Sequence, residues 1–206
     1  MLWGGHTGGL ELRKRASGAM ALRGRFPYGK RAVLSDGGRT GRPRKEAIAP
    51  RAFAYRVNKP EEDIHLLVGH SYDRPLASRG AGTLDLTDSD DALTFEARIT
   101  EEMQEVSYVQ DFLNAFAAGL IMGISPGFRL PPKRAVPNPE LIEDEGHDPE
   151  NGMHNAIIRT VLAALLYELS VVTRPAYPEA QIEARNWQET DAGLIVPQNP
   201  LNRWRL

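Results

Sequence analysis

The chain has 206 residues, of which 41% are hydrophobic and 25% charged, and its formal net charge is −2. This length and composition predict one soluble globular domain with a sizeable core. The absence of cysteine excludes a disulfide framework, a thiol nucleophile and Cys-ligated metal sites. Because the most apolar stretches are short, we expect no membrane span and no secretory signal, and therefore a cytoplasmic protein.

The charges are distributed unevenly along the chain. Residues 1–51 contain twelve Lys and Arg against three Asp and Glu, so this part carries +9 and the remainder −11. A basic segment can bind nucleic acid or an acidic protein surface. No aromatic residues interleave the basic cluster as a stacking platform for bases would require. A solvated basic face is therefore the simpler interpretation, and nucleic-acid binding is not expected.

Most of the chain before residue 100 is predicted to form β-strands. Residues 1–18 are basic and rich in glycine, which predicts a flexible leader. Residues 35–46 have the Gly, Pro and Arg content of a loop, and a turn is expected through Asp73 and Pro75. The predicted strands, recognised by alternating or β-branched apolar residues, are 19–34 with breaks at Pro27 and Gly29, 47–57, 63–70, 77–86 and 92–99.

The strand over 63–70 has the clearest alternation of the five. By the two-residue period of a strand, Ile64, Leu66, Val68 and His70 share one face. His65 and Leu67 point to the other face.

A helix is predicted after this run of strands. Thr100 is expected to cap it, and the acidic residues that follow favour the positive end of the helix dipole. Its apolar residues between Val106 and Leu120 recur at helical spacing and form one stripe. Gly119 and Gly123 are expected to end the helix just before the sequence GISPGFRL.

The rest of the chain is predicted to contain a loop, two strands, a short helix and a tail. A mobile surface loop is expected over 131–152. The apolar stretch 156–172 fits either one helix or two strands flanking a turn, and its β-branched ends favour the strands. Pro178 would open the last helix, and 190–206 would form an irregular C-terminal tail. Many short strands with few helices predict a mainly β, α+β fold: a barrel or sandwich with peripheral helices, in one domain over residues 19–189.

The segment from Gly123 to Gly127 matches G-x-S-x-G, the pattern of a nucleophile elbow around Ser125. Flanking glycines let the backbone turn sharply and expose the hydroxyl, although simple turns also match this pattern. An α/β-hydrolase elbow needs a strand before the serine and a helix after it. Here a helix is predicted before Ser125, and Pro126 and two later prolines block a helix behind it. The hydrolase order would also require His147 or His154, which flank the acidic loop.

A serine nucleophile needs a base, and histidine is the usual one near neutral pH. Of the five histidines, His70 alone stands where a strand ends in a polar turn, although a structural hydrogen-bonded histidine would fit there equally well. Glu168 is a carboxylate inside an apolar run, so we expect it to be buried with a partner. That partner is either a histidine that it orients or an arginine without a catalytic role. No histidine pair has metal-ligand spacing, and no metal or cofactor is predicted.

Four sequence blocks, in order, resemble those of the tailed-phage prohead serine proteases, which mature capsids and are distantly similar to herpesvirus assemblins. The blocks are EAIAPRAF, LLVGHSYDRPLAS, the helix running into GLIMGISPGF, and ELSVVTRPAYPEAQI. The resemblance covers residues 24–184 and fits a phage or a phage-like gene transfer agent. It implies a herpesvirus-protease-like closed β-barrel surrounded by helices. It also implies a serine endopeptidase that cleaves capsid or scaffold segments, and could cleave itself, inside assembling proheads.

The resemblance also implies catalytic roles for particular residues. His70 would be the base, Ser125 the nucleophile and Glu168 the third member of the triad. Asp73 and His65 are alternatives for that third position.

The oxyanion donors depend on the residue after the nucleophile. Pro126 has no N–H, so an oxyanion donor at this position is excluded. This favours main-chain amides near Thr173 and Arg174, with amides elsewhere around Ser125 as the alternative.

The implied partners are the major capsid protein or a scaffold segment, and a homodimer is compatible with the sequence. No membrane is expected as a partner. One alternative function is a non-catalytic capsid-assembly or scaffolding module, because the uneven charge would serve head-to-tail association equally well. Another is an esterase that uses the same serine, whose small-ester turnover would survive His70→Ala.

Overall fold

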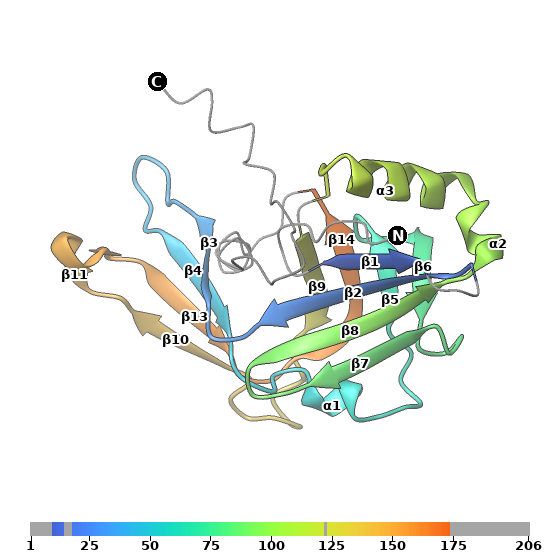
Figure 1. Ribbon diagram of the computed structural model, residues 1–206. Coiled ribbons are helices and arrows are strands. Elements are labelled where there is room, and N and C mark those ends of the chain that lie inside the picture. The colour runs from blue at the N-terminus through green and yellow to red at the C-terminus, as the bar shows by residue number, and fades with distance from the viewer. Residues whose placement is uncertain (1–9, 15–17, 122, 174–206) are drawn as a thin grey trace, which may run out of the picture.

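The computed structural model describes residues 10–14, 18–121 and 123–173, and strands dominate this part of the chain (Figure 1). The helices are α1 (Ala54–Val57), α2 (Glu101–Gln104), α3 (Ser107–Ala117) and a short 3-10 turn, Pro149–Asn151. The strands are β1 (Glu11–Lys14), β2 (Met20–Pro27), β3 (Arg31–Ser35), β4 (Arg44–Ile48), β5 (His65–Val68), β6 (Ser71–Ser78), β7 (Leu84–Asp88), β8 (Ala92–Ile99), β9 (Gly123–Arg129), β10 (Glu140–Asp144), β11 (His147–Asp148), β12 (Met153–His154), β13 (Ile157–Val161) and β14 (Leu165–Val172).

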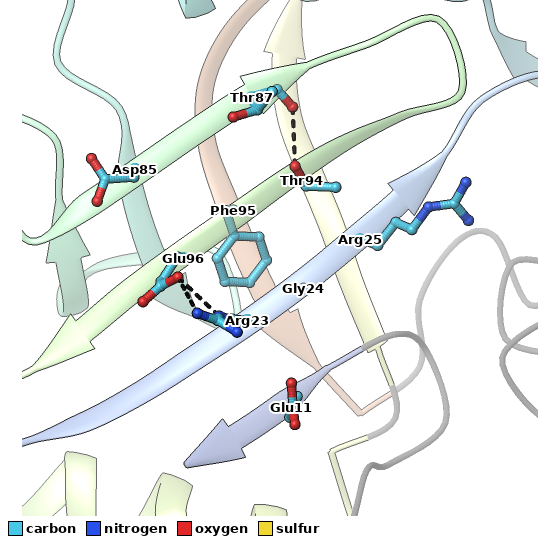
Figure 2. Close-up of a pocket in the computed structure, with 9 residues that line it drawn as sticks. All are labelled: Glu11, Arg23, Gly24, Arg25, Asp85, Thr87, Thr94, Phe95 and Glu96. Carbon is cyan, nitrogen blue, oxygen red and sulfur yellow. Dashed lines mark hydrogen bonds and ion pairs between the residues drawn. The ribbon is translucent and has the colours of Figure 1, made fainter. Parts of the chain in front are cut away.

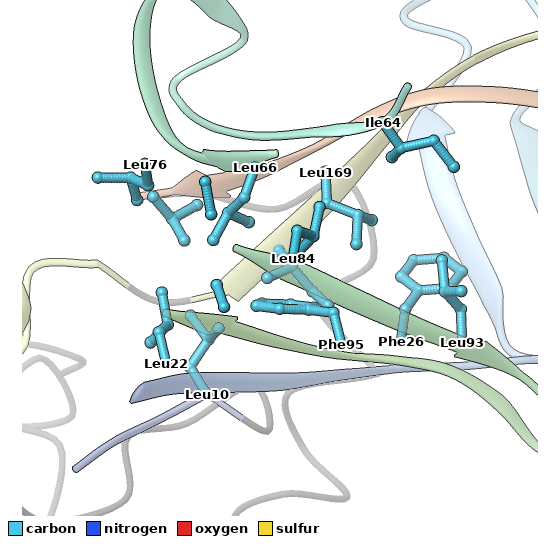
Figure 3. Close-up of a cluster of buried hydrophobic side chains, with 14 of the residues drawn as sticks. Leu10, Leu22, Phe26, Ile64, Leu66, Leu76, Leu84, Leu93, Phe95 and Leu169 are labelled. Atoms are coloured by element: carbon cyan, nitrogen blue, oxygen red, sulfur yellow. The ribbon is translucent and has the colours of Figure 1, made fainter. Parts of the chain in front are cut away.

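Two four-stranded sheets enclose the main hydrophobic core. Their strand orders are β1-β2-β8-β7 and β6-β5-β14-β9. Figure 3 shows Leu22 and Phe95 of the first sheet meeting Leu66 and Leu169 of the second. Because side chains alternate along a strand, the residues of β5 and β14 that alternate with these core residues face away from the core. That outward face carries the candidate site.

A third sheet projects from this sandwich as an arm, with the strand order β10-β13-β4-β3 (Figure 1). The short β11–β12 ladder lies at its far end. Arg159 in β13 links two neighbouring strands, because its guanidinium lies 2.9 Å from Glu46 of β4 and 2.6 Å from Glu140 of β10. Lys45 pairs with Glu145 at 2.5 Å. The arm is thus held by cross-strand ion pairs as well as by main-chain pairing.

The helix predicted after residue 100 forms as two helices, α2 and α3. Thr100 caps the first as predicted, and its hydroxyl accepts a hydrogen bond from the Met103 amide at 3.4 Å. The apolar stripe of α3 is buried on the core, and Tyr108 donates to the Pro75 carbonyl of β6 at 2.7 Å. None of the helices in the described residues has the length and apolar character that a membrane crossing requires.

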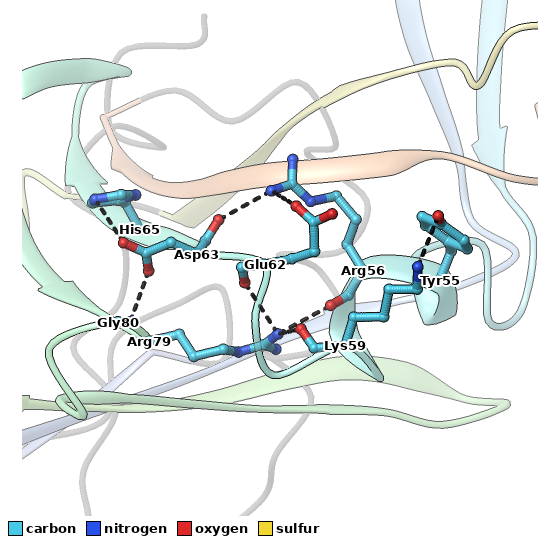
Figure 4. Close-up of polar contacts among 8 residues, drawn as sticks. All are labelled: Tyr55, Arg56, Lys59, Glu62, Asp63, His65, Arg79 and Gly80. Carbon is cyan, nitrogen blue, oxygen red and sulfur yellow. Dashed lines mark hydrogen bonds and ion pairs between the residues drawn. The ribbon is translucent and has the colours of Figure 1, made fainter.

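The segment 47–57, expected as a strand, instead leaves β4 at Ile48 and forms the short helix α1. The Arg79 side chain, from a distant part of the chain, stabilises α1 and the turn after it. Its guanidinium donates to the carbonyls of Arg56 at 3.0 Å and Lys59 at 2.9 Å (Figure 4). It also donates to the Val57 carbonyl at 3.0 Å. These carbonyls at the end of α1 and in the turn after it therefore receive hydrogen bonds from a side chain at least twenty positions later in the chain. Local sequence carries no sign of such a distant partner.

Three other segments differ from the sequence-based expectation. Glu11–Lys14 of the expected leader forms β1, which pairs with β2. The expected turn through Asp73 and Pro75 lies inside β6, where the pairing with β5 has two irregularities. The expected loop over 131–152 contains β10, an edge strand of the arm. Edge strands are often charged, so their composition resembles that of a loop.

The predicted closed barrel is not confirmed. Within the described ranges the strands form three separate four-stranded sheets and the two-stranded β11–β12 ladder, and none of them closes on itself. Alternating hydrophobicity shows that a strand has one buried face, but it does not determine whether the outer strands of a sheet meet. The two strands predicted over 156–172 are confirmed as β13 and β14. The predicted helix at Pro178 and the tail lie outside the described residues.

Asp88 at the end of β7 should make the stability of the fold depend on pH. The Tyr28 hydroxyl donates to its Oδ1 at 2.6 Å, while its Oδ2 is buried without a hydrogen-bond partner among the described residues. Burial raises the pKa of Asp88 above its ordinary value of 3.8 and also raises the pKa of Tyr28. The pKa of the Asp88 carboxyl is higher in the folded protein than in the unfolded chain. Ionisation of this carboxyl therefore lowers the free energy of unfolding above the folded-state pKa, and the loss disappears as the pH falls toward 3.8.

We therefore expect Asp88→Asn to raise the melting temperature at pH 7, with a difference from wild type that shrinks as the pH is lowered toward 4. Thermal melts followed by circular dichroism across this range measure both quantities. Asp90→Asn is the matched control, because the Asp90 side chain is 76% exposed and pairs with Arg51 on the surface. A lower melting temperature for Asp88→Asn at pH 7 would contradict the prediction.

Candidate active site

One sheet brings three of the sequence blocks together. In β6-β5-β14-β9, strand β14 runs parallel to β5 and antiparallel to β9. Glu168 stands opposite His65 on one side and Gly127 on the other, while Ser170 stands opposite Leu67 and Ser125. Leu169 and Val171 belong to the core, so the residues that alternate with them face outward.

His70 lies in the two-residue turn that joins β5 to β6. Val68 pairs with Ser71, and both Gly69 (φ 62°) and His70 (φ 61°) have left-handed backbone conformations. Positive φ at both central positions is the hallmark of a type I′ hairpin turn. This turn interrupts the strand alternation, so the prediction that His70 shares a face with Leu66 is wrong. The imidazole instead reaches a carboxylate on the opposite face of the sheet.

That carboxylate belongs to Glu168. His70 Nδ1 lies 2.7 Å from Glu168 Oε1, and the Ser170 hydroxyl donates to Oε2 at 2.7 Å. Glu168 is only 4% exposed, so both oxygens of a buried carboxylate are satisfied. Its hydrogen-bond partners in the described chain are a histidine and a serine, and not an arginine. A carboxylate accepts the Nδ1 proton, which leaves Nε2 of the half-exposed imidazole as the basic nitrogen.

Ser125 is placed by the strand register. It stands directly opposite Ser170, and opposed residues of an antiparallel pair have Cβ atoms about 4.5–5.5 Å apart on the same face. Ser170 in turn accepts a hydrogen bond from the His70 main-chain N–H at 2.9 Å. The Ser125 side chain is partly exposed. Pro126 is tolerated beside it because β9 is an edge strand, where a missing N–H need not break the ladder.

Gly127 provides the space for the Glu168 carboxylate. A Cβ added at Gly127 would lie 2.6 Å from Glu168 Cδ and 2.8 Å from Cγ, and closer still to Oε1. Carbon atoms in contact normally stay 3.5–4.0 Å apart. Gly127, the second glycine of the G-x-S-x-G pattern, therefore leaves room for the Glu168 carboxylate of the neighbouring strand, in addition to any effect on Ser125.

His65 and Asp73, the two alternatives to Glu168 as third member of the triad, have other surroundings. His65 Nε2 is 3.5 Å from Asp63 Oδ2, and its ring packs edge-on against Tyr72 at 5.8 Å. Asp73 is exposed in β6. Among the described residues neither makes a hydrogen bond with His70. Burial, and to a lesser extent the Glu168 charge, raise the pKa of Tyr72.

The predicted oxyanion region is only partly described. Thr173 follows β14 directly and is exposed, whereas Arg174 lies outside the described residues. The assignment of oxyanion donors to these two amides therefore stays a prediction.

Sequence reasoning missed two residues of the site, Ser170 and Gly127. A signal for Ser170 was present, because a serine two residues after Glu168 in a strand must share its face. No comparable signal existed for Gly127, since its role depends on which residue of β14 it faces.

A hollow of about 420 Å³ lies elsewhere, on the sheet β1-β2-β8-β7 (Figure 2). The Arg23–Glu96 ion pair, at 2.7 Å, crosses it. None of the candidate catalytic residues lines this hollow, and we do not assign the site to it. In the part of the chain that the structure describes, no group of three or more His, Asp or Glu side chains is placed to hold a metal ion.

A histidine bonded to a buried carboxylate, on a sheet face that also carries a serine, has the features of a hydrolytic site. The family model described as caudovirus prohead serine protease matches residues 35–192, well over half of the chain, and the chain belongs to this family. The family makes it a peptidase that acts in capsid maturation, in contact with capsid or scaffold proteins inside the assembling capsid. No curated protein and no solved structure matches the chain.

Proposed function

We propose that the protein is a serine endopeptidase with Ser125 as nucleophile, His70 as general base and Glu168 as the acid that orients the base. The observation that carries this proposal is the 2.7 Å hydrogen bond between His70 Nδ1 and Glu168 Oε1, beside the strand that holds Ser125. Asp73 and His65 are less suitable orienting groups, because neither bonds to His70 among the described residues.

The reaction would be acyl transfer. His70 Nε2 takes the proton of the Ser125 hydroxyl as its oxygen attacks the peptide carbonyl, and the resulting imidazolium is stabilised by Glu168. The imidazolium then protonates the leaving amine. Water, deprotonated by the same nitrogen, releases the acyl group and regenerates Ser125. Because Pro126 lacks an N–H, main-chain donors after β14, near Thr173, would hold the oxyanion.

The substrates would be segments of the major capsid protein or of a scaffold, cut inside the assembling prohead. Family membership supports this choice of substrate. The chain itself is a further candidate substrate, because it would be confined in the same assembling prohead.

Covalent labelling with a fluorophosphonate tests the catalytic assignment. An activated serine should react, with a single adduct mapped to Ser125 by peptide mass spectrometry, and His70→Ala should lower the labelling rate by about 10³-fold or more. Ser107 on the surface of α3 serves as the internal control. It makes no hydrogen bond with a histidine among the described residues and should stay unlabelled. Absence of an adduct at Ser125 in protein that is folded by circular dichroism would overturn the proposal and favour a non-catalytic assembly module.

A further inference from the structure

A buried hydroxyl connects the two residues proposed to activate the nucleophile. Ser170 has no exposed surface, and it lies in β14 two residues after Glu168. Its O–H donates to Glu168 Oε2 at 2.7 Å, and its oxygen accepts from the His70 main-chain N–H at 2.9 Å. One side chain therefore contacts both the carboxylate and the backbone that carries the imidazole.

The His70 backbone needs such support. A non-glycine residue with φ 61° is in the left-handed region, which its side chain disfavours. The neighbouring Gly69 N–H donates to the Val171 carbonyl at 3.1 Å, so the whole turn is attached to the end of β14 through residues 170 and 171. Because the imidazole extends from this turn, a shift of the turn would move Nε2 relative to Ser125.

The carboxylate needs support on its second oxygen as well. His70 occupies Oε1 only, and Gly127 leaves room for the carboxylate but offers no side chain to hold it. The Ser170 hydroxyl fixes the rotation of the carboxylate about its last bond, so that Oε1 stays directed at the imidazole.

We propose that Ser170 is a positioning residue of the active site, which fixes the Glu168 carboxylate and the His70 turn relative to each other. This inference rests on the proposed function of the His70, Ser125 and Glu168 set. The position requires a small group that donates and accepts at once, which limits it to a hydroxyl side chain. Alanine can do neither, and cysteine does both only weakly.

Saturation kinetics of fluorophosphonate labelling separate positioning from binding. We expect Ser170→Ala to lower the maximal labelling rate constant about 10–100-fold, because a small displacement of reacting groups has effects of this size. The half-saturating probe concentration should stay within about twofold of wild type, since Ser170 is buried and does not touch the probe. Ser170→Thr keeps the hydroxyl and should react faster than Ser170→Ala.

A matched control comes from the β7–β8 turn. The Ser89 hydroxyl likewise donates to one group, the Ala92 carbonyl at 2.9 Å, and accepts from another, the Ala92 amide at 3.1 Å, but it lies outside the site. Ser89→Ala should melt at a lower temperature and label at the wild-type rate. If Ser170→Ala does not fold, Ser170→Cys, which is close in shape, should show the same loss in maximal rate in a weaker form.

The possible results distinguish this inference from the proposed function. Suppose that the wild type is labelled at Ser125 and that folded Ser170→Ala or Ser170→Cys has the same maximal labelling rate constant. This result would overturn the positioning role and leave the proposed function intact. A threonine variant no faster than the alanine variant would also overturn it. Failure of the wild type to label would instead count against the proposed function itself.

Discussion

Ser125→Ala should abolish processing of the capsid protein when the two proteins are produced together. Loss of the nucleophile in serine proteases of this chemical type lowers kcat by about 10⁶-fold, because no other group can form the acyl intermediate. The fold should be retained, since the Ser125 hydroxyl has no hydrogen-bond partner among the described residues. Its removal should therefore change the free energy of unfolding by less than about 0.5 kcal/mol. Gel electrophoresis and intact-mass spectrometry of the capsid protein measure the processing.

Two further variants make this result specific. Ser107→Ala removes a hydroxyl on the surface of α3 and should leave processing unchanged. His70→Ala combined with Ser125→Ala should be no less active than Ser125→Ala alone, because residues that act as one unit are not additive. Continued cleavage of the capsid protein by Ser125→Ala would show that the site has been assigned wrongly.

The sequence predicted most strands of the sandwich, because each of them has one apolar face that must be buried. It predicted the end of β5 at a polar turn and the pair β13–β14, whose β-branched residues mark strands on either side of a short connection. It also predicted that Glu168, inside an apolar run, is a buried carboxylate with a partner. A carboxylate among leucines and valines has to find a partner, and Glu168 has two.

The parts that could not be predicted depend on contacts between distant segments. The pairing of Ser125 with Ser170 is a matter of register, and a shift of one residue would have turned either side chain into the core. The left-handed turn at His70 is stabilised by residues a hundred positions later, so strand alternation alone put the imidazole on the wrong face. Helix α1 likewise depends on Arg79, and β10 on its pairing with β13 in the arm.

Gly127→Ala should be the most damaging single-methyl change in the site. The new Cβ would lie 2.6 Å from Glu168 Cδ, so the carboxylate has to move. It is held from both ends, by His70 and by Ser170, and a displacement weakens both hydrogen bonds. Hydrogen bonds to a charged group contribute about 1.5–3 kcal/mol each. Alanine in place of glycine returns only about 0.5–1 kcal/mol through the lower entropy of the unfolded chain. The net expectation is a loss of about 1–3 kcal/mol in the free energy of unfolding, with labelling of Ser125 slowed about 100-fold.

A double-mutant cycle with Glu168→Ala tests whether the clash with the carboxylate is the cause. If it is, Gly127→Ala should cost about 0.5 kcal/mol or less once the Glu168 side chain is gone, because nothing remains for the new methyl to displace. Urea unfolding of the four proteins gives the coupling energy directly. Equal costs of Gly127→Ala in the two backgrounds would mean that the glycine is required by the backbone of β9. It would then have no role in placing the acid, and the close approach of Glu168 would follow from the strand geometry alone.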